Sequence, residues 1–258
     1  MKDVQSSPDH RNLPIDMVGV KGLRYPIVVL DKNDREQHTV ASIDMYVDLP
    51  HHFRGTHMSR FIEILNEHHK AVHITRLASM LTAMRSSFDA SAAHLEVRFP
   101  YFIAKRAPVT GAMGLMDYEC TFQAISSQKG DDAVVGIKVP VMTLCPCSKE
   151  ISDHGAHNQR GVVSLDVRYR KMIWIEDLIA TVESCASSPI YAILKRPDEK
   201  HVTEASYQNP KFVEDVVRDV SMAMNANNRV SWFRVSAENF ESIHNHSAYA
   251  LIEQTKKE

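Results

Sequence analysis

The sequence has almost no net charge, few cysteines and no long apolar run. Lys and Arg number 30 against 32 Asp and Glu, which leaves a formal net charge of −2. A nucleic-acid-binding chain would be strongly basic and an acidic tail would show a run of like charge, so we expect neither. The longest apolar stretches, Tyr25–Leu30 and Val139–Leu144, are strand-sized and far short of the ~20 residues that cross a membrane. We therefore expect no nucleic-acid partner and no membrane span.

Cysteine usage and the first residues of the chain favour the cytoplasm. Four cysteines in 258 residues are too few for a disulfide scaffold. The chain starts with a polar, proline-interrupted segment that lacks the apolar core of a secretory signal. Hydrophobic residues at 44% and charged residues at 24% are typical of a globular protein with a substantial core. Cys145 and Cys147 are separated by one residue, which suggests chemistry or metal binding.

The order of the predicted elements indicates an α+β protein. Runs of β-branched and aromatic residues predict strands, and apolar residues three and four apart predict helices. The order strand, strand, helix, helix, strand, strand occurs twice. The first set is predicted at Leu23–Leu30, Val40–Leu49, Phe61–His68, Ile74–Met84, Leu95–Ile103 and Leu115–Ile125. The second set is predicted at Val134–Leu144, Gly161–Arg170, Ile175–Ser184, Lys211–Met224, Val230–Val235 and Ala248–Gln254.

This repeat predicts an N-terminal arm followed by two ββααββ units in a single integrated domain. Residues 1–20 are polar and have no apolar period, which predicts a flexible arm. The first unit is expected at 21–132 and the second at 133–258. Antiparallel hairpins beside a pair of helices favour helices on one face of each sheet, and the edge strands would then seek partners in other subunits.

The stretch Leu144–Gly161 is predicted to be an irregular loop that carries chemistry. A loop of this length inside a compact unit is usually functional or disordered. A thiolate is a soft metal ligand, and it is a strong nucleophile when nearby cations lower its pKa. The alternative is that the two cysteines are free and only pack. The reactive or charged side chains of the stretch are Cys145, Cys147, Lys149, His154, His157 and Arg160.

Three further segments carry metal-ligating or acidic side chains. On a helical turn Glu241 and His244 would share one side, whereas on a strand His244 and His246 would share a face. A solvated polar turn is an equally good interpretation of that segment. The segment 198–201, Asp-Glu-Lys-His, is typical of an exposed charged loop. Glu214 follows an Asn-Pro helix start and would, by itself, be taken as solvent-facing.

Together, five segments resemble the prokaryotic type IB GTP cyclohydrolase I family, which has the tunnelling fold. The segments occur in the expected order and span most of the chain. The resemblance implies two ββααββ units per chain, with antiparallel sheets and helices on one face, and a homotetramer in which barrels form between subunits. The segments are GTHMSRF at 55–61, CPCSKEIS at 145–152, GAHNQR at 155–160, NPKFVED at 209–215 and ESIHNH at 241–246.

The resemblance also implies a reaction and a set of site residues. The family converts GTP and water to 7,8-dihydroneopterin triphosphate and formate, the first step of tetrahydrofolate biosynthesis. A divalent metal ion, Mn²⁺, Fe²⁺ or Zn²⁺, would activate the water that attacks purine C8. By this resemblance, the metal ligands are Cys145, Glu199, Glu241 and His244. The catalytic pair is Cys147 and His157, Glu214 binds the purine, and Arg60, Lys149 and Arg160 bind the triphosphate.

Three other interpretations stay open at this point. Another tunnelling-fold enzyme, such as an NADPH-dependent nitrile reductase, would use a cysteine covalently and would not need Glu241 and His244. The thiol and imidazole cluster could instead hold a structural metal, in which case chelation would unfold the protein. Cys145 and Cys147 could also oxidise to a strained disulfide that expels the metal and stops activity.

Overall fold

The computed structural model describes residues 5, 7, 9–32, 35–68 and 77–256. They belong to two compact units, Met1–Pro100 with Thr121–Val134 and Tyr101–Cys120 with Val135–Glu258. The three strands β3, β4 and β5 contribute residues to both units, so the units do not follow the division at 132/133 suggested by the repeat. These strands are β3 (Ala92–Arg106), β4 (Met113–Ser127) and β5 (Gly130–Leu144).

The first unit is an antiparallel sheet with two helices. β1 pairs with β2, and β2 pairs with β3. In β2, Ile43, Met45 and Val47 are buried at every second position, because alternate side chains of a strand face the same side. Phe61 of α1 stacks on Phe88 of α2 with 4.3 Å between ring centroids. The elements are β1 (Ile15–Leu30), β2 (Glu36–Leu49), α1 (Met58–His68) and α2 (Leu77–Phe88).

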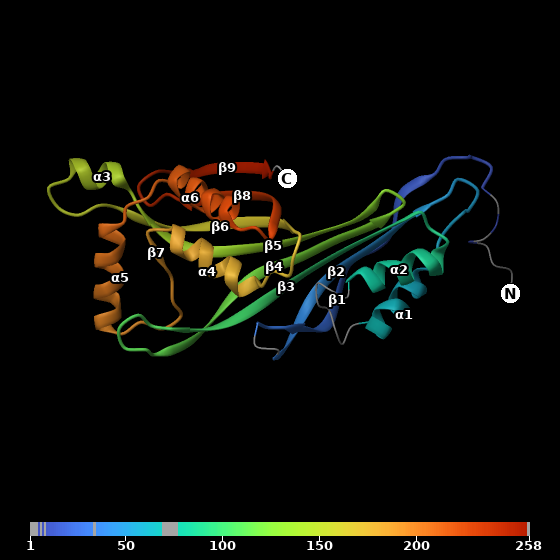
Figure 1. The fold of residues 1–258 in the computed structure, drawn as a ribbon, viewed down its shortest axis with the longest axis horizontal. Helices are drawn as coiled ribbons and strands as arrows, with labels where there is room; N and C mark the ends of the chain where they lie inside the picture. Colours follow the sequence, from blue (N-terminus) through green and yellow to red (C-terminus); the bar gives the residue numbers. More distant parts are fainter. Residues whose placement is uncertain (1–4, 6, 8, 33–34, 69–76, 257–258) are drawn as a thin grey trace. The chain divides into compact units, whose positions relative to one another are not determined.

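The second unit contains the rest of the sheet and four helices among the described residues. Figure 1 shows α4 and α6 close together; α6 packs on β8 and β9, whereas Glu183 of α4 accepts a hydrogen bond from the Tyr118 hydroxyl of β4. Val163 and Leu165 of β6 and Val217 and Val220 of α6 are buried. The elements are α3 (Pro146–Ile151), β6 (Asn158–Tyr169), α4 (Ile175–Cys185), β7 (Ser188–Pro189), α5 (Arg196–Gln208), α6 (Val213–Ala226), β8 (Val230–Phe240) and β9 (Ser247–Thr255).

The strand order along the sheet is β1-β2-β3-β4-β5-β6-β8-β9, with β7 paired to β5. Each strand from β1 to β6 thus lies beside its neighbour in the chain, even where helices intervene, and the short β7 is the exception because it pairs with β5 and leaves β6 beside β8. The predicted α+β class, with antiparallel strands and paired helices, is confirmed. β9 is the last strand of the order, and Tyr249 and Leu251 on it are exposed.

Several predicted bounds need correction. β1 begins at Ile15, inside the segment 1–20 that we expected to be an arm. The stretch Leu144–Gly161 is not irregular throughout, since it contains the helix α3 and the first residues of β6. Ile74, which was part of the second helical pattern, lies outside the described residues.

The prediction of a loop at 198–201 is wrong, because this segment belongs to the helix α5. The sequence pattern gives little sign of this helix, since few of its side chains are apolar. Its start is stabilised instead by Asp198, which is fully buried. One carboxylate oxygen of Asp198 accepts a hydrogen bond from the Lys195 amide at 2.9 Å, as in a capping box.

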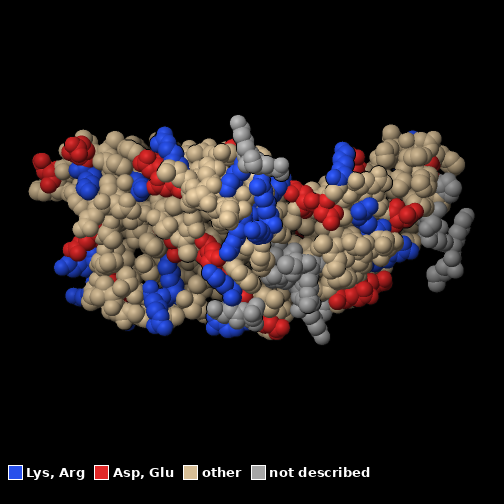
Figure 2. All heavy atoms as spheres, in the orientation of Figure 1, with Lys and Arg blue, Asp and Glu red and all other residues tan. Residues whose placement is uncertain are grey.

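Charges of both signs are mixed over the surface of each unit on the face seen in Figure 2, in agreement with the small net charge. No helix among the residues described here has the length and apolar character to span a membrane.

Candidate active site

A cavity of about 280 Å³ in the second unit gathers most of the predicted site residues. Four segments that are distant in the sequence form its wall: the start of α3, the start of β6, the start of α6 and the β8–β9 loop. Its lining residues are Cys145, Cys147, His157, Gln159, Lys211, Phe212, Val213, Glu214, Asn239, Glu241, His244, His246 and Ala248.

The two neighbouring cysteines flank the first residue of α3. Cys145 is the N-cap residue, and its Sγ accepts a hydrogen bond from the Ser148 amide at 3.4 Å. Pro146 follows at the first helical position, where its missing N–H costs nothing. Cys145 is half-buried and Cys147 is exposed, and both are free thiols. This local structure explains why the C-P-C sequence holds two thiols at one rim of the cavity.

The backbone of His157 is fixed to the same turn. Its carbonyl oxygen accepts a hydrogen bond from the Cys145 amide at 3.1 Å. Its own amide donates to the Ser148 Oγ at 3.1 Å. The Ser148 hydroxyl in turn donates to the Cys145 carbonyl at 3.2 Å. These three bonds hold Cys145, Ser148 and His157 as one rigid group.

The His157 ring has two polar neighbours at Nδ1. Gln159 Oε1 lies 3.0 Å from Nδ1, and the Ser242 Oγ lies 3.4 Å from it. Gln159 Nε2 donates to the Thr143 Oγ1 at 3.0 Å. Gln159 and Thr143 are both buried, whereas Ser242 is exposed.

The segment 241–246 is a series of bends between β8 and β9. It is therefore neither the helical turn nor the strand considered from the sequence, and a local turn gives Glu241 and His244 a common cavity. Glu241 is half-buried and His244 is exposed. The rings of His244 and His246 stack with 5.2 Å between centroids and an interplanar angle of 20°.

The start of α6 brings a carboxylate to the cavity. The Phe212 amide donates to the Asp215 Oδ2 at 3.0 Å, which leaves the exposed Glu214 free of a capping role. A negative charge in the first turn of a helix is stabilised by the helix dipole. The Lys211 amide donates to the Leu144 carbonyl at 3.0 Å, and this bond ties the start of α6 to the residue before Cys145.

Four predicted residues do not line this cavity. Glu199 is exposed on α5, and Arg160 is exposed on β6, next to the buried Gln159. Lys149 Nζ donates to the Tyr207 carbonyl near the end of α5 at 2.6 Å and lies 4.5 Å from the centroid of the Tyr207 ring. Its ammonium therefore stabilises a helix end in this structure.

Arg60 belongs to the first unit. It lines a cavity of about 170 Å³ there, together with residues of the GTHMSRF segment and the end of α2. Its Nη1 donates to the Ser87 carbonyl at 3.1 Å.

The donor types in the Cys145 cavity fit a divalent metal ion. A thiol, a carboxylate and an imidazole, from Cys145, Glu241 and His244, suit borderline cations such as Mn²⁺, Fe²⁺ or Zn²⁺. In the part of the chain that the structure describes, no three His, Cys, Asp or Glu side chains are close enough together to hold an ion. To hold an ion together, these side chains would have to move toward one another.

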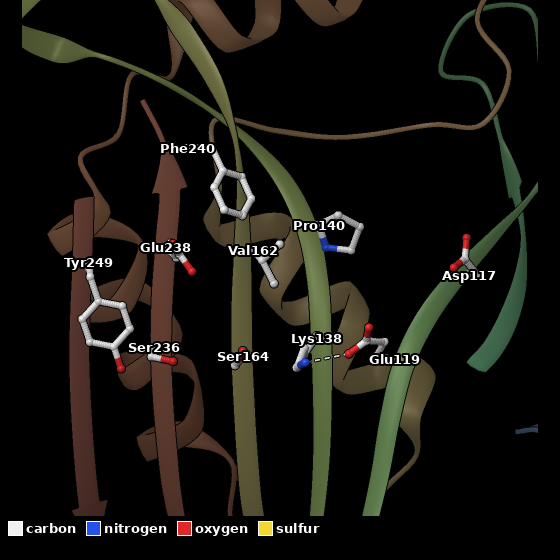
Figure 3. Close-up of a pocket in the computed structure, with 10 residues that line it drawn as sticks. All are labelled: Asp117, Glu119, Lys138, Pro140, Val162, Ser164, Ser236, Glu238, Phe240 and Tyr249. Carbon is white, nitrogen blue, oxygen red and sulfur yellow. Dashed lines mark hydrogen bonds and ion pairs between the residues drawn. The ribbon is translucent and has the colours of Figure 1, made fainter. Parts of the chain in front are cut away.

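A second cavity of about 400 Å³ lies on the sheet face away from α4 and α6 (Figure 3). It is an open surface of mixed polar and apolar side chains across the strands β4, β5, β6, β8 and β9. Lys138 Nζ forms an ion pair with the Glu119 Oε2 at 2.6 Å, as the dashed line shows. This cavity contains none of the predicted site residues.

Sequence reasoning gave no role to several residues of the Cys145 cavity or of its immediate support. Thr143 left no signal beyond its place near the thiols, and Gln159 lies in the GAHNQR segment but received no role, because only the fold brings the two side chains together. Lys211 and His246 lie within segments that carried the resemblance, so their position could have been suspected. Asn239 is buried at the end of β8, where its Oδ1 would lie 2.5 Å from a Cβ at Gly161.

Comparison with solved structures identifies the fold. A uricase from Bacillus fastidious aligns with a TM-score of 0.56 at 8% identity, over 93% of this chain and 92% of that one. The uricase from Arthrobacter globiformis aligns with a TM-score of 0.52 at 11% identity, over 94% and 93%. These similarities confirm the tunnelling fold.

Sequence comparison identifies the family. The chain is 58% identical to GTP cyclohydrolase FolE2 of Geotalea uraniireducens over 100% of this chain and 95% of that protein. It is 56% identical to GTP cyclohydrolase FolE2 of Geobacter sulfurreducens over 100% of this chain and 99% of the relative. A family model described as type I GTP cyclohydrolase folE2 matches residues 1–250. With its fold, its cavity and these relatives in agreement, the chain belongs to the type I GTP cyclohydrolase FolE2 family.

Proposed function

We propose that this chain is a GTP cyclohydrolase I and that its reaction takes place in the Cys145 cavity. The reaction converts GTP and water to 7,8-dihydroneopterin triphosphate and formate, at the entry to tetrahydrofolate biosynthesis. One observation carries the choice of cavity. Thiols, imidazoles and carboxylates from four distant segments line a single cavity in a chain of this family.

Cys145, Glu241 and His244, with Glu199, are the proposed metal ligands. Three of them line the cavity, and Glu199 would join them by a movement of its exposed side chain. A divalent cation held by these residues would supply an acidified water at neutral pH for the hydrolysis of the purine ring. Mixed thiolate, carboxylate and imidazole donors are compatible with Mn²⁺, Fe²⁺ or Zn²⁺.

His157 and Cys147 are the proposed proton-transfer groups. An imidazole changes its charge near neutral pH, so His157 can take up and return protons as the imidazole ring of the purine opens. Cys147 is exposed in the first turn of α3 and can donate or accept a second proton. The bonds from Cys145 and Ser148 to the His157 backbone hold this imidazole beside the two thiols.

Glu214 is the proposed purine-binding residue. Its carboxylate lies in the first turn of α6, faces the cavity and has two oxygens that can accept from guanine N1–H and N2–H. The triphosphate would be bound by Arg60, Lys149 and Arg160. Among these, Lys149 would have to exchange its bond to the Tyr207 carbonyl for a phosphate oxygen.

The proposed assembly is a homotetramer with barrels completed between subunits. The last strand of the sheet order, β9, supports this proposal, because an edge strand offers unpaired N–H and C=O groups to a second chain. The proposed location is the cytoplasm, which supplies GTP and keeps the thiols of Cys145 and Cys147 reduced.

Turnover under defined metal conditions tests the function. Purified protein stripped of metal is given GTP with Mn²⁺, Fe²⁺ or Zn²⁺, and formate and the oxidised, dephosphorylated fluorescent pterin are measured. We expect both products with at least one metal and neither in chelator. Reduction of a deazapurine nitrile by NADPH, with no product from GTP, would instead support the reductase alternative.

A further inference from the structure

We propose that Gln159 is a positioning residue that sets the tautomer of His157, an inference that rests on the proposed catalytic role of that histidine. The hydrogen bonds run from the sheet to the cavity. Gln159 Nε2 donates to the Thr143 Oγ1 at 3.0 Å, and Gln159 Oε1 lies 3.0 Å from the His157 Nδ1.

The burial of Gln159 shows that its amide is held in one place. Gln159 is 7% exposed and Thr143 is 0% exposed. A buried amide without partners costs free energy, so such a side chain is retained when its hydrogen bonds are made. Because β6 lies beside β5, the Thr143 hydroxyl is close enough to accept the hydrogen bond from the amide nitrogen, and the carbonyl oxygen of the same amide faces His157.

This orientation decides which ring nitrogen of His157 carries the proton. The amide nitrogen of Gln159 donates to Thr143, so the group that faces His157 is the carbonyl oxygen, which can only accept. The neutral ring therefore keeps its proton on Nδ1 and donates it to Oε1. Nε2 is left as the proton acceptor of a ring that lines the cavity.

Ser242 is the other group near Nδ1, and it does not change this conclusion. Its Oγ lies 3.4 Å from Nδ1, longer than the Gln159 contact, and the side chain is exposed on the β8–β9 loop. A hydroxyl can donate or accept, so Ser242 accommodates either tautomer. The Gln159 Oε1 can only accept, and it is the nearer of the two groups, so it selects the tautomer that carries the proton on Nδ1.

The tautomer is measured directly by NMR of ring-¹⁵N histidine in the full chain without added metal, at a pH where the ring is neutral. The His157 signals are assigned by difference against His157→Gln. We expect a protonated Nδ1 and an unprotonated Nε2 in the native chain. In Gln159→Leu the preference should be lost or reversed. An unprotonated Nδ1 in the native chain would overturn the proposal, whether or not the protein turns over GTP.

Kinetics then show whether the tautomer matters. Loss of a group that orients a histidine typically costs 10–100-fold in activity, so kcat of Gln159→Leu should fall by about that factor while KM stays within ~2-fold. Gln159→Glu keeps an acceptor toward Nδ1 and should recover most of kcat. Asn158→Ala, at the neighbouring exposed position, is the matched control and should behave as the native chain.

The outcomes separate the two proposals. Equal kcat for Gln159→Leu and the native chain, or an equal loss in Gln159→Leu and Gln159→Glu with the tautomer unchanged, would contradict the positioning role. Absence of product from the native chain would contradict the proposed function, and the NMR result would still decide the tautomer.

Discussion

The amide nitrogen of Cys145 donates a hydrogen bond to the carbonyl oxygen of His157 at 3.1 Å. A proposed metal ligand and a proposed catalytic imidazole therefore share one backbone bond, although twelve positions separate them in the numbering. Between the two bonded residues the chain forms α3, and β6 begins directly after His157. The position of the imidazole relative to the thiols is thus set by the backbone and not by side-chain contact alone.

Ser148→Ala tests this arrangement. The substitution removes the hydroxyl that donates to the Cys145 carbonyl and accepts from the His157 amide. At about 0.5–1.5 kcal/mol per hydrogen bond, we expect a loss of about 1–3 kcal/mol in the free energy of unfolding, together with a lower kcat. Urea denaturation and GTP turnover measure both. Ser152→Ala, at the other end of α3, removes two hydrogen bonds to His154 at exposed positions, where water replaces them, so it should cost less stability and leave kcat unchanged. An equal loss of kcat in the two variants would contradict the account.

His244→Ala and His246→Ala test the proposed ligand set. The two rings stack on one another and line the same cavity, so the variants remove similar volume at similar exposure. His244→Ala should lower the affinity for Mn²⁺ or Zn²⁺ at least tenfold, because it removes a ligand. His246→Ala should lower it much less. Calorimetric titration of metal into stripped protein measures the difference, and the reverse order would exchange the roles of the two histidines.

Chelation should abolish turnover without unfolding the protein. The core of the second unit is built from β6, β8, α4 and α6, and the Cys145 cavity lies only at the ends of β6, β8 and α6. Circular dichroism should therefore be unchanged by chelator at 25 °C while formate release stops, and added metal should restore activity. Cooperative unfolding on chelation would support a structural metal instead.

Asp198 and Glu199 are adjacent, but substitutions at the two positions should affect different properties, namely stability and metal binding. Burial raises the pKa of Asp198, but hydrogen bonds from the Thr110 hydroxyl and from the amides of Thr110, Lys195 and Val109 outweigh this effect. They hold the pKa well below its usual range. Asp198→Asn should thus lower the Tm, whereas Glu199→Gln, at an exposed position, should leave the Tm nearly unchanged but weaken metal binding.

The same carboxyl predicts a pH dependence. A group whose pKa is lowered by folding stabilises the folded state above its unfolded pKa, here 3.8, and this contribution is lost as the pH falls below that value. The Tm difference between the native chain and Asp198→Asn should accordingly be constant near neutral pH and shrink below about pH 4. A difference that grows on acidification would contradict this assignment.

Gly161→Ala should disturb the wall of the cavity. A Cβ at this position would lie 2.5 Å from the Asn239 Oδ1 and 3.0 Å from the Glu238 carbonyl oxygen, so the buried Asn239 side chain would have to move and the β8 backbone to give slightly. Overpacking of this kind costs about 1–3 kcal/mol. Gly55→Ala is the control, because its Cβ would make only an ordinary contact of 3.5 Å with Gln5. Equal free energies of unfolding for the two variants would contradict this prediction, because they would show that the added Cβ is accommodated without loss of stability.

The strands and the paired helices could be predicted because their apolar residues follow a regular period. α5 could not, since its stability comes from one buried carboxylate, Asp198, whose partners Val109 and Thr110 lie on the distant β3–β4 connection. A capping side chain with partners far along the chain leaves no periodic signal. The hydrogen bonds from Thr143 through Gln159 to His157 could not be predicted for the same reason. They form only because β5 and β6 are neighbours in the sheet.

The candidate site was predictable in its residue types but only partly in its geometry. Resemblance named the cysteines, Glu214, Glu241 and His244, and all of them line one cavity. Local spacing could not place the segment 241–246, because its bends follow neither a helical nor a strand period. Arg60 lies in the first unit, and its part in triphosphate binding stays a prediction.

The most direct test of the central claim is the stoichiometry of formate and pterin from GTP, measured side by side for the native chain, Cys147→Ser and His157→Gln with Mn²⁺ present. We expect equimolar formate and dihydroneopterin triphosphate from the native chain and a fall of at least about 10²-fold in both variants, since each removes a proton-transfer group. Native-like turnover in either variant would contradict the assignment of the Cys145 cavity as the active site.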